Sequence, residues 1–416
     1  MYSKFPSATV VQKYGGTSVG SPERIVHVAE RVVRLNREHK LRCAVVVSAM
    51  SGETNRLVAL MNQINPDASK RNYDMAVAAG EQISTALVAA AIERCGAKAR
   101  SLLAYQLGIY TDSFHSKARI ASIRTEKIEE CWRNGEIPVI AGFQGVTQDM
   151  EITTLGRGGS DTSAVAIAIA LKADFCEINT DVNGFYTADP RMVSAAKLCP
   201  VLDYDLAFEM ASLGSKVLHA RSVEIAAKYR MPLTVRNTFQ PDTHERTVIM
   251  SLSEQEKLEA PVVSGVTVDQ QIAKLTIENL NPGVHTISEI FELIAKSEIN
   301  VDIIVHNRTS NKDEMQLGFS LNRGEKDRAL SILGQWNEKQ RQKASIRAEE
   351  GLSKISCVGI GMQSHPGVAS RCFRVLAQNN IEIHMISTSE IKISCVIDEA
   401  DTKKAAQLLH AAFLEA

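Results

Sequence analysis

Hydrophobic and polar positions along the first 240 residues follow an alternating pattern. Short runs rich in β-branched residues, such as residues 8–12 and 43–48, alternate with longer segments whose apolar positions recur at helical spacing. The two runs are continuously apolar, which is typical of strands that are buried on both faces of a parallel sheet. We therefore expect an α/β unit in which helices sandwich a mostly parallel sheet.

The segment between those two runs shows why a helix is expected. Ser21 can cap its first turn, and Pro22 occupies a position where the missing N–H costs nothing. Its apolar positions form one stripe, made of Ile25, Val28, Ala29, Val32 and Val33. By the same criteria, further strands are expected at 137–143, 175–180 and 233–236, and further helices at 75–94, 161–171 and 216–229.

The alternation stops near residue 250, and the rest of the chain is repetitive. Residues 251–261 are polar and end in proline, which indicates a linker. Residues 282–307 and 366–389 both begin with Pro-Gly-Val and then follow the order helix, two strands, helix. Aligned with each other, the two copies share Phe291 with Phe373, Ala295 with Ala377, Ile299 with Ile381, and Ile304 with Ile386. This duplication predicts two small α+β modules of the ferredoxin-like type.

The second copy ends one strand short of a complete sheet, whereas the first can finish with a strand near 345–349. The apolar segment 262–268 has no other role, so we predict that it pairs into the sheet of the second module. The expected domains are a first unit at 1–250, a linker at 251–261, one module at 269–350, and a second module made of 262–268 plus 351–416.

Composition narrows the classes of function. Lys and Arg together number 47 and Asp and Glu 48, so no global field attracts nucleic acid. No apolar run reaches the ~18 residues of a membrane span, and the N-terminus lacks the features of an export signal. The eight cysteines are scattered without a C-x-x-C pair. These features predict a cytoplasmic protein with reduced, buried thiols that binds small ligands, and neither nucleic acid nor a membrane.

The first candidate for chemistry is the segment around Lys13, Gly15 and Gly16, at the end of the first predicted strand. Open α/β sheets bind ligands at the carboxyl ends of their strands. Glycines let backbone N–H groups approach phosphate oxygens, and a lysine supplies a compact positive charge. An ordinary strand-to-helix turn would use the same residues, so the segment alone does not decide between the two.

The second candidate is the segment 154–162, which contains Arg157, Gly158, Gly159 and Asp161 and runs directly into an apolar helix. Helix N-termini favour anions, and a guanidinium can hold a carboxylate through two parallel hydrogen bonds. An ordinary N-cap at Ser160 or Asp161 is the alternative, but it does not account for the glycines and Arg157 together.

Two further polar segments complete the set. Residues 180–191 follow a predicted strand and could hold a nucleoside, although a surface turn is an equal alternative. Residues 214–219 place Lys216 at the start of a helix, where a lysine opposes the helix dipole. That position is unfavourable for stability and indicates a phosphate contact.

At these residues the sequence resembles the aspartate kinase branch of the amino-acid kinase family. The resemblance covers essentially the whole chain. It rests on KYGGTS from Lys13, SAM from Ser48, GE at Gly80, FQGVT from Phe143, TLGRGGSDT from Thr154, TDVNGFYTADPR from Thr180, GSKVLH from Gly214, and two ACT-like modules. It implies a kinase that moves the γ-phosphate of ATP to the β-carboxylate of L-aspartate, as the first step of lysine, threonine and methionine biosynthesis. The alternatives are a kinase of another small carboxylate and a catalytically idle amino-acid sensor.

The resemblance also implies roles for individual residues. Lys13 and Lys216 would contact the phosphates and converge beside Arg157, while Asp161 would position the lysines and Glu81 would bind the amino group of aspartate. The implied substrate-binding residues are Ser48, Thr54, Glu81, Arg157, Gly158, Gly159 and Ser160. The implied ATP-binding residues are Lys13, Tyr14, Gly15, Gly16, Thr180, Asp181, Tyr186, Asp189, Arg191 and Lys216. Mg²⁺ is expected to accompany ATP, without a dedicated protein metal site.

ACT modules usually associate and bind amino acids, so the resemblance further implies a homo-oligomer with feedback inhibition by lysine, threonine or both. The first copy departs from the usual pattern, because its Pro-Gly turn follows Asn279, Leu280 and Asn281 instead of an acidic residue. We hypothesise an effector site where this loop meets a second-copy surface of another subunit. Its expected residues are Asn281, His285, Asn300, Val301, Asp302 and His306.

Overall fold

The computed structural model describes residues 8–215, 217–240, 245–253, 261–280, 284–308, 315–340 and 343–415. By its internal contacts the chain divides into two compact units. The first contains residues 1–185, 198–212 and 216–254, and the second contains residues 186–197, 213–215 and 255–416. The division therefore does not follow one linear boundary, because two short segments of the N-terminal half pack with the C-terminal unit.

The first unit is an α/β fold around an eight-stranded sheet with the order β10-β12-β11-β9-β1-β2-β6-β3. Its strands are β1 (Thr9–Tyr14), β2 (Arg42–Val47), β3 (Lys98–Leu102), β6 (Glu136–Ala141), β9 (Phe175–Thr180), β10 (Val201–Leu202), β11 (Leu233–Asn237) and β12 (Thr247–Ile249). All neighbouring strands are parallel except β11 and β12. The mostly parallel sheet and the fold class predicted from the sequence are confirmed.

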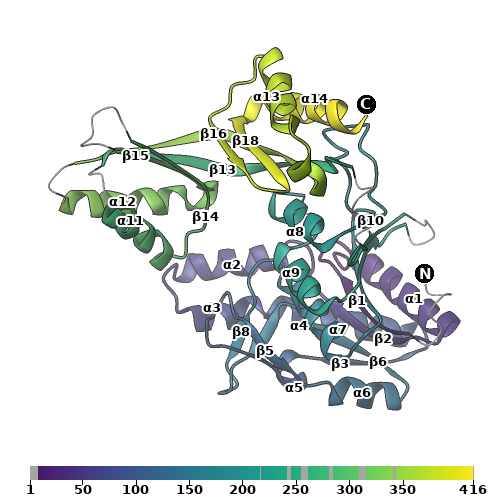
Figure 1. Ribbon diagram of the computed structural model, residues 1–416. Coiled ribbons are helices and arrows are strands. Elements are labelled where there is room, and N and C mark those ends of the chain that lie inside the picture. Colours follow the sequence, from purple (N-terminus) through teal and green to yellow (C-terminus); the bar gives the residue numbers. More distant parts are fainter. Residues whose placement is uncertain are drawn as a thin grey trace. The chain divides into compact units, whose positions relative to one another are not determined.

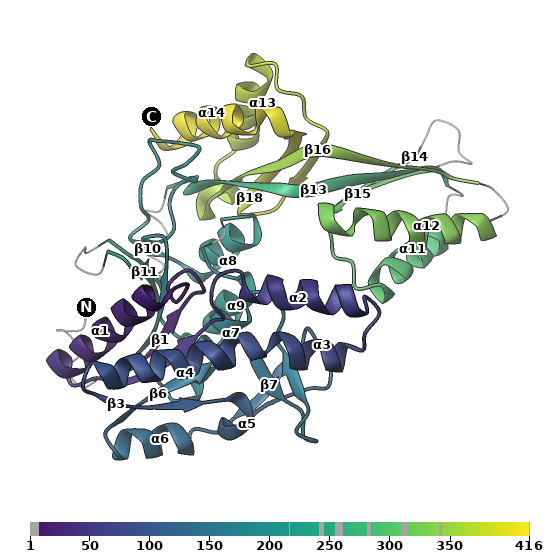
Figure 2. The same cartoon turned by 180° about the vertical axis from the view of Figure 1, so that it is seen from behind.

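Helices cover both faces of this sheet. The described helices of the unit are α1 (Pro22–His39), α2 (Glu53–Ile64), α3 (Lys70–Val77), α4 (Ala79–Arg94), α5 (Ala104–Leu107), α6 (Glu126–Arg133), α7 (Gly159–Ala170), α8 (Tyr204–Ser212) and α9 (Ala220–Tyr229). Helices α1 and α4 pack on one face, where they share a core with β1, β2, β6 and β9 (Figure 2). Helix α7 packs against β1 from the other face, with α9 beside it (Figure 1).

A second, four-stranded sheet in this unit has the order β5-β4-β7-β8 and was not predicted. Its strands are β4 (Ile109–Thr111), β5 (Ile120–Ile123), β7 (Gln144–Val146) and β8 (Ile152–Thr154). They are three or four residues long, too short to give a period-two pattern that can be recognised in the sequence. Strand β8 leads directly into the glycine-rich turn before α7, so this small sheet supports one of the predicted binding segments.

The predicted helix 75–94 is two helices, α3 and α4, which meet at Ala78. By length and composition, Lys70–Arg94 is the one helical stretch in the described residues that could cross a membrane, and 56% of its most apolar window is buried in the fold. Core helices share this property. Here the stretch also carries the buried carboxylates of Asp74 and Glu81.

The second unit is built on one six-stranded sheet with the order β14-β15-β13-β16-β18-β17. Its strands are β13 (Gly265–Leu280), β14 (Val301–Arg308), β15 (Met315–Asn322), β16 (Ser345–Val358), β17 (Met385–Thr388) and β18 (Lys392–Asp398). Its α-helices are α11 (Val284–Lys296), α12 (Lys326–Lys339), α13 (Val368–Gln378) and α14 (Thr402–Leu414), with short 3-10 turns at Arg323–Glu325, Ile360–Ser364 and Glu399–Asp401.

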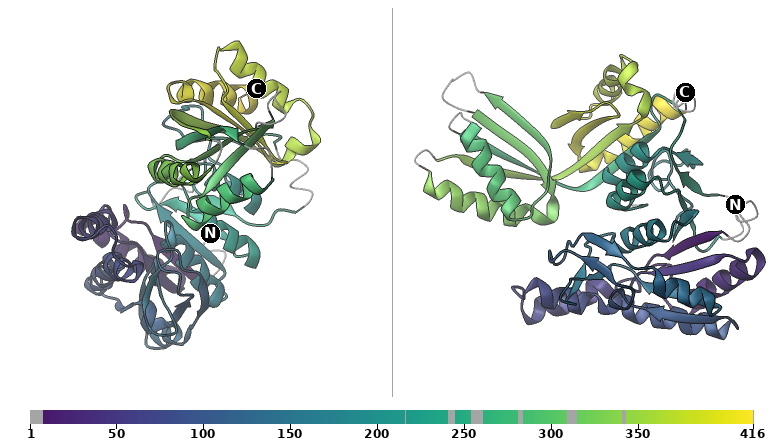
Figure 3. Two further views of the ribbon diagram at one scale, coloured as in Figure 1. Left: turned by 90° about the vertical axis from the view of Figure 1, so that its left-hand side faces the viewer. Right: turned by 60° about the horizontal axis from the view of Figure 1, so that its bottom comes forward.

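The two long strands β13 and β16 run through both modules of this unit (Figure 3). The first part of β13 pairs with β16 from Gly265 opposite Val358 to Val268 opposite Ile355, and β16 continues the pairing into β18. The segment that was predicted to complete the second module therefore does pair there, from Gly265 onward. The sequence did not indicate that it continues without interruption into the first module.

Each module covers the shared sheet with its own pair of helices, on opposite faces (Figures 1 and 2). Leu275 and Ile277 of β13 lie in the core beneath α11 and α12, whereas Val266 lies in the core beneath α13 and α14. Between these positions the pairing of β13 with β16 shifts register, once from Asp269 to Ile272 and again from Ile272 to Lys274. Residues 186–197 add Ala188 and Val193 to the core of the second module, and Thr187 Oγ1 lies 2.9 Å from His410 Nε2.

Candidate active site

Three loops meet at the carboxyl ends of the neighbouring strands β9, β1 and β2. The N–H of Gly15 donates to the carbonyl of Asn179 over 3.1 Å, and the N–H of Ser51 donates to the carbonyl of Gly16 over 3.1 Å. Because β1 lies between β9 and β2, the turn after β1 is held from both sides. This is the edge of an open α/β sheet at which ligands bind.

Lys13 and Asp161 form an ion pair at this edge. Along β1, Val10 and Tyr14 face the core beneath α1 and α4, so Lys13 faces the opposite side, where α7 packs. Its ammonium nitrogen lies 2.6 Å from Asp161 Oδ1 in the first turn of α7, and both side chains are about nine-tenths buried. The pair brings together a strand and a helix start that are about 150 residues apart in the sequence.

The glycines after β1 allow a close approach of backbone segments. A Cβ on Gly16 would lie 2.8 Å from the carbonyl oxygen of Ala49, and a Cβ on Gly15 would lie 3.5 Å from the ammonium of Lys13. A side chain at Gly16 would therefore collide with the turn after β2, whereas one at Gly15 would be in ordinary van der Waals contact with the lysine.

The turn before α7 also depends on glycine. Gly158 has φ +67 and caps the helix, and a Cβ there would lie 2.2 Å from the Cβ of His219. The N–H of His219 in turn donates to Asp161 Oδ2 over 3.3 Å. Ser160 is buried in the first turn of α7, and Gly159 packs against Phe143. The sequence predicted an anion site at the N–H groups of this helix start, and that site stays a prediction.

Glu81 is the most perturbed carboxylate of the group. It lies in the first turn of α4 and is 3% exposed. Its Oε1 accepts the N–H of Ala49 over 3.0 Å, whereas Oε2 has no hydrogen-bond partner among the described residues. Burial raises the pKa of Glu81 to about 7, although the Ala49 N–H and the charge of Lys13 act in the opposite direction. A buried, unpartnered carboxylate oxygen is suited to a cationic ligand group.

The remaining substrate residues that were predicted lie on three segments of the same unit. Ser48 directly follows β2, and its N–H donates to the carbonyl of Tyr14 over 3.1 Å. Thr54 lies in the first turn of α2 and is half-buried. Arg157 is exposed, and its charge contributes to lowering the pKa of His219, for which burial is the main cause. Its guanidinium is thus close to the turn before α7 and open to solvent.

Two of the residues predicted for ATP binding end a strand in this unit. Thr180 is the last residue of β9, and its hydroxyl donates to Asp181 Oδ1 over 3.2 Å. Tyr14 is different, because its ring is fully buried in the core beneath α1 and burial raises the pKa of its hydroxyl. Its side chain cannot reach a nucleotide, so only its backbone is available to one.

Three other residues predicted for ATP binding lie outside the first compact unit. Tyr186, Asp189 and Arg191 belong to the second compact unit. Asp189 and Arg191 form an ion pair with each other at 2.7 Å. Lys216 lies outside the described residues, so the expected convergence of Lys13 and Lys216 beside Arg157 stays a prediction.

The residues predicted for the effector lie in the first module of the second unit. His285 is exposed in the first turn of α11. Asn300 directly precedes β14, Val301 and Asp302 are its first two residues, and the Asp302 carboxylate pairs with the buried ammonium of Lys354. His306 is exposed further along β14, and Asn281 lies outside the described residues. A shared effector site for these residues stays a prediction.

Two residues of the site were not singled out from the sequence. His219 was part of a quoted motif, and it packs on Gly158 while its N–H binds Asp161. Asn179 donates its side-chain amide to the carbonyl of Lys13 over 3.3 Å and offers its own carbonyl to Gly15. Asn179 had no distinct signal in the sequence, because Glu177 and Thr180 of the same strand are polar as well.

Comparison with known proteins bears on this geometry. Residues 8–237 match the amino acid kinase family, and residues 355–413 match the ACT domain. The chain is 44% identical to aspartokinase 2 of Bacillus subtilis over 404 residues, which is 97% of each chain. It is 46% identical to the aspartokinase of Pseudomonas aeruginosa over 408 residues, which is 98% of this chain and 97% of that protein. The chain belongs to the aspartate kinase family.

Solved aspartate kinase structures agree with the fold. Aspartokinase III of Escherichia coli, crystallised with aspartate and ADP, matches with a TM-score of 0.80 at 25% identity, over 98% of this chain and 100% of that one. The same enzyme with lysine and aspartate matches with a TM-score of 0.73. As an aspartate kinase, the chain is an ATP-dependent phosphotransferase that phosphorylates aspartate, as the sequence predicted.

Proposed function

We propose that this aspartate kinase transfers the γ-phosphate of ATP to the β-carboxylate of L-aspartate and releases 4-phospho-L-aspartate. The observation that carries the assignment is the buried Lys13–Asp161 ion pair beside the unpartnered oxygen of Glu81. The Lys13 ammonium, which can bind a phosphate, and the Glu81 carboxylate, which can bind an ammonium group, thus lie at one edge of the sheet. An amino-acid substrate that accepts a phosphoryl group needs both.

Lys13 has the central role in the transfer. Phosphoryl transfer depends on in-line positioning and on neutralising the charge of the moving group. The acceptor carboxylate is already ionised at pH 7, so no general base is required. Its charge repels the triphosphate, and each cation contact offsets on the order of 4 kcal/mol at about 4 Å in a partly shielded site. Asp161 holds the Lys13 ammonium in place, and Lys216 supplies the second cation.

The substrate aspartate is held at its two charged ends. Glu81 Oε2 accepts its ammonium, and the exposed guanidinium of Arg157 forms two parallel hydrogen bonds with its α-carboxylate. Ser48 and Thr54 add hydroxyl contacts. The N–H groups at Gly158, Gly159 and Ser160 favour the anion that develops beside the start of α7.

ATP binds along the glycine turn after β1. Its phosphates lie against Lys13, Gly15 and Gly16, and its nucleoside lies against the loop that begins at Thr180 and Asp181. Mg²⁺ comes with ATP and neutralises phosphate charge when bound. Among the described residues no group of three or more His, Cys, Asp and Glu side chains could hold a metal ion.

The enzyme catalyses the first step of lysine, threonine and methionine biosynthesis in the cytoplasm. Its ACT modules give it feedback regulation by lysine, threonine or both. Two observations support this assignment. The match to the ACT domain covers the second module, and a relative, the E. coli enzyme, was crystallised with lysine. Two modules on one sheet leave the edge strands β14 and β17 for association in a homo-oligomer.

A coupled ADP-release assay with L-aspartate, L-glutamate and N-acetylglutamate tests the function. We expect turnover with L-aspartate alone. Lys13→Ala should lower kcat by about 100-fold or more, while the KM for aspartate changes by less than about threefold. Lys127→Ala is the control, because Lys127 is an exposed lysine on α6 of the same unit. A kcat of Lys13→Ala close to that of wild type would refute the proposed role of Lys13, and preference for another acceptor would refute the substrate.

A further inference from the structure

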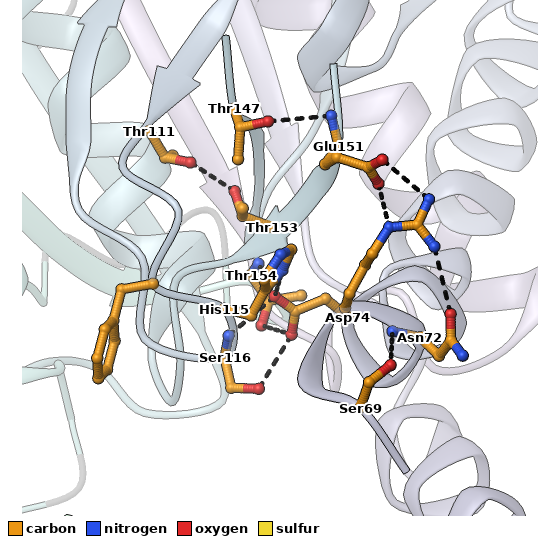
Figure 4. A network of polar contacts seen from close by, with 12 residues as sticks. Ser69, Asn72, Asp74, Thr111, His115, Ser116, Thr147, Glu151, Thr153 and Thr154 are labelled. Carbon is orange, nitrogen blue, oxygen red and sulfur yellow. Dashed lines mark hydrogen bonds and ion pairs between the residues drawn. The ribbon is translucent and has the colours of Figure 1, made fainter. Parts of the chain in front are cut away.

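A fully buried carboxylate outside the site described above accepts an unusually complete set of hydrogen bonds. Asp74 lies in α3, and Figure 4 shows donors from two other segments converging on it. Its Oδ2 accepts the N–H of Thr154 at 2.9 Å and the N–H of Ser116 at 2.8 Å, with His115 Nδ1 at 3.1 Å. Its Oδ1 accepts the hydroxyls of Thr154 at 2.8 Å and Ser116 at 3.1 Å.

On one side, Asp74 is joined to the helix that carries Glu81. Helices α3 and α4 are separated only by Ala78, whose N–H donates to the carbonyl of Asp74 over 3.0 Å. The carbonyl of Ala78 accepts the side-chain amide of Gln144 over 3.2 Å. Ala78 is therefore hydrogen-bonded at both its N–H and its carbonyl, and it links Asp74 to the helix that carries Glu81.

On the other side, Asp74 holds the base of the loop that carries Arg157. Thr154 is the last residue of β8, three positions before Arg157. A Cβ on Gly156 would lie 3.1 Å from the carbonyl oxygen of Ser116, so the Ser116 segment packs directly against this loop. Both segments that bond to the Asp74 carboxylate thus support the Arg157 turn.

We propose that Asp74 is a positioning residue that fixes the spacing between Glu81 and Arg157, and through it the length of the amino-acid substrate that the enzyme accepts. This inference rests on the proposed function, in which these two residues hold the ammonium and the α-carboxylate. With the spacing fixed, the β-carboxylate of aspartate lies in line with the phosphoryl group. The longer side chain of glutamate places its carboxylate out of that line. A looser spacing weakens this discrimination.

Two substitutions can test the charge of Asp74 and its hydrogen bonds separately. In Asp74→Asn, the amide oxygen can take the place of Oδ2 and accept both N–H groups. Its NH₂ can take the place of Oδ1 and donate to the two hydroxyls, because a hydroxyl also accepts. Asp74→Asn therefore keeps the links, whereas Asp74→Ala removes them all. Thr154→Val removes one hydroxyl bond while the N–H of residue 154 remains.

The experiment measures the KM for aspartate, the KM for ATP and the ratio of kcat/KM for aspartate over glutamate in these three variants. We expect Asp74→Ala to raise the aspartate KM at least tenfold, to change the ATP KM less than about twofold, and to lower the ratio at least tenfold. Thr154→Val should raise the aspartate KM and lower the ratio about threefold each with the ATP KM nearly unchanged, which keeps the test available if Asp74→Ala does not fold. Asp74→Asn should stay within about threefold of wild type.

Asp203→Ala is the matched control. Asp203 is a buried carboxylate of the same unit that accepts the N–H groups of Asp205 and Leu252. Its loss should lower thermal stability without an aspartate-specific change in KM. Equal effects on both KM values, or an unchanged aspartate-to-glutamate ratio in Asp74→Ala and Thr154→Val, would overturn the inference. If Glu81→Gln and Arg157→Lys also leave the aspartate KM unchanged, the proposed substrate contacts themselves fail.

Discussion

Glu81→Gln is expected to weaken aspartate binding while it stabilises the protein above neutral pH. The substitution keeps the shape of the side chain, and its amide oxygen can still accept the N–H of Ala49. It removes a carboxylate that is 3% exposed and has one oxygen without a partner among the described residues. Burying such a charge in the free enzyme costs stability, because the unfolded chain solvates it fully.

The size of this effect follows from the pKa. Burial raises the pKa of Glu81 from 4.5 to about 7, so the folded state binds the proton more tightly than the unfolded state. At about 1.4 kcal/mol per pH unit, the difference corresponds to about 3 kcal/mol of lost stability above pH 7. The loss shrinks as pH falls through 7 and is absent below pH 4.5. The amide NH₂ of glutamine lacks a partner as well, which costs about 1–2 kcal/mol. The expected net gain at pH 8 is therefore about 1–2 kcal/mol.

Thermal unfolding at pH 5, 6, 7 and 8 tests this reasoning. The Tm of Glu81→Gln minus that of wild type should be positive at pH 8, by about 2–8 °C, and should decrease steadily toward pH 5. Glu93→Gln, an exposed position on the same helix, is the control and should show no such trend. In the kinetic assay at pH 8, Glu81→Gln should raise the aspartate KM at least tenfold. A Tm difference that is independent of pH would refute the argument, because it would mean that the buried carboxylate carries no cost.

Three further predictions concern Arg157, Gly158 and the ACT modules. Arg157→Lys should raise the aspartate KM at least tenfold with the ATP KM nearly unchanged, because an ammonium cannot make two parallel hydrogen bonds; equal changes in both would contradict the role. Gly158→Ala should lower the Tm by several degrees, since φ is +67 and a Cβ would lie 2.2 Å from His219, whereas Gly135→Ala, at φ +69 with open space, should lower it less. Lysine and threonine, titrated singly and mixed, should inhibit turnover, and no response to either would contradict ACT-mediated feedback.

The turn before α7 illustrates how stability and function compete at this site. Gly156 and Gly158 both have positive φ, and the second lies directly against His219. Glycine at two positions in three lowers the stability of the free loop, because it increases the entropy of the unfolded chain. The same residues bring the N–H groups at the start of α7 close to where we expect the anion. The loss of stability therefore falls at the candidate site, where the charged residues Arg157 and Asp161 also lie.

Much of the fold was readable from the sequence because its signals are local. The strands β1, β2, β9 and β11 are short segments rich in β-branched and apolar residues, and the sequence placed each within one or two residues. Helix α1 followed from its Ser21 cap and one apolar stripe. The duplication and the count of strands together predicted that the segment beginning at Gly265 pairs with the second module.

The candidate site was readable only in part. Lys13, Arg157 and Asp161 lie in dense polar segments, which stand out against apolar strands and helices. Glu81 had no such signal, because a glutamate on an alanine-rich helix is usually solvated. Its burial depends on the close packing of Gly80 on Ala49, where a Cβ would lie 2.8 Å from the Ala49 side chain. The Tyr14 side chain was placed at the nucleotide by motif alone, and its alternation along β1 turns it into the core.

The sequence by itself therefore determined the class of fold, the two modules and the segments that carry the chemistry. Those features depend on periodicity, turn residues and composition, which act over a few neighbouring positions. The tertiary structure decided which atoms meet: the Lys13–Asp161 pair, the unpartnered oxygen of Glu81 and the bonds that converge on Asp74. Such contacts join residues far apart along the chain, and burial alters their charges only once the chain has folded.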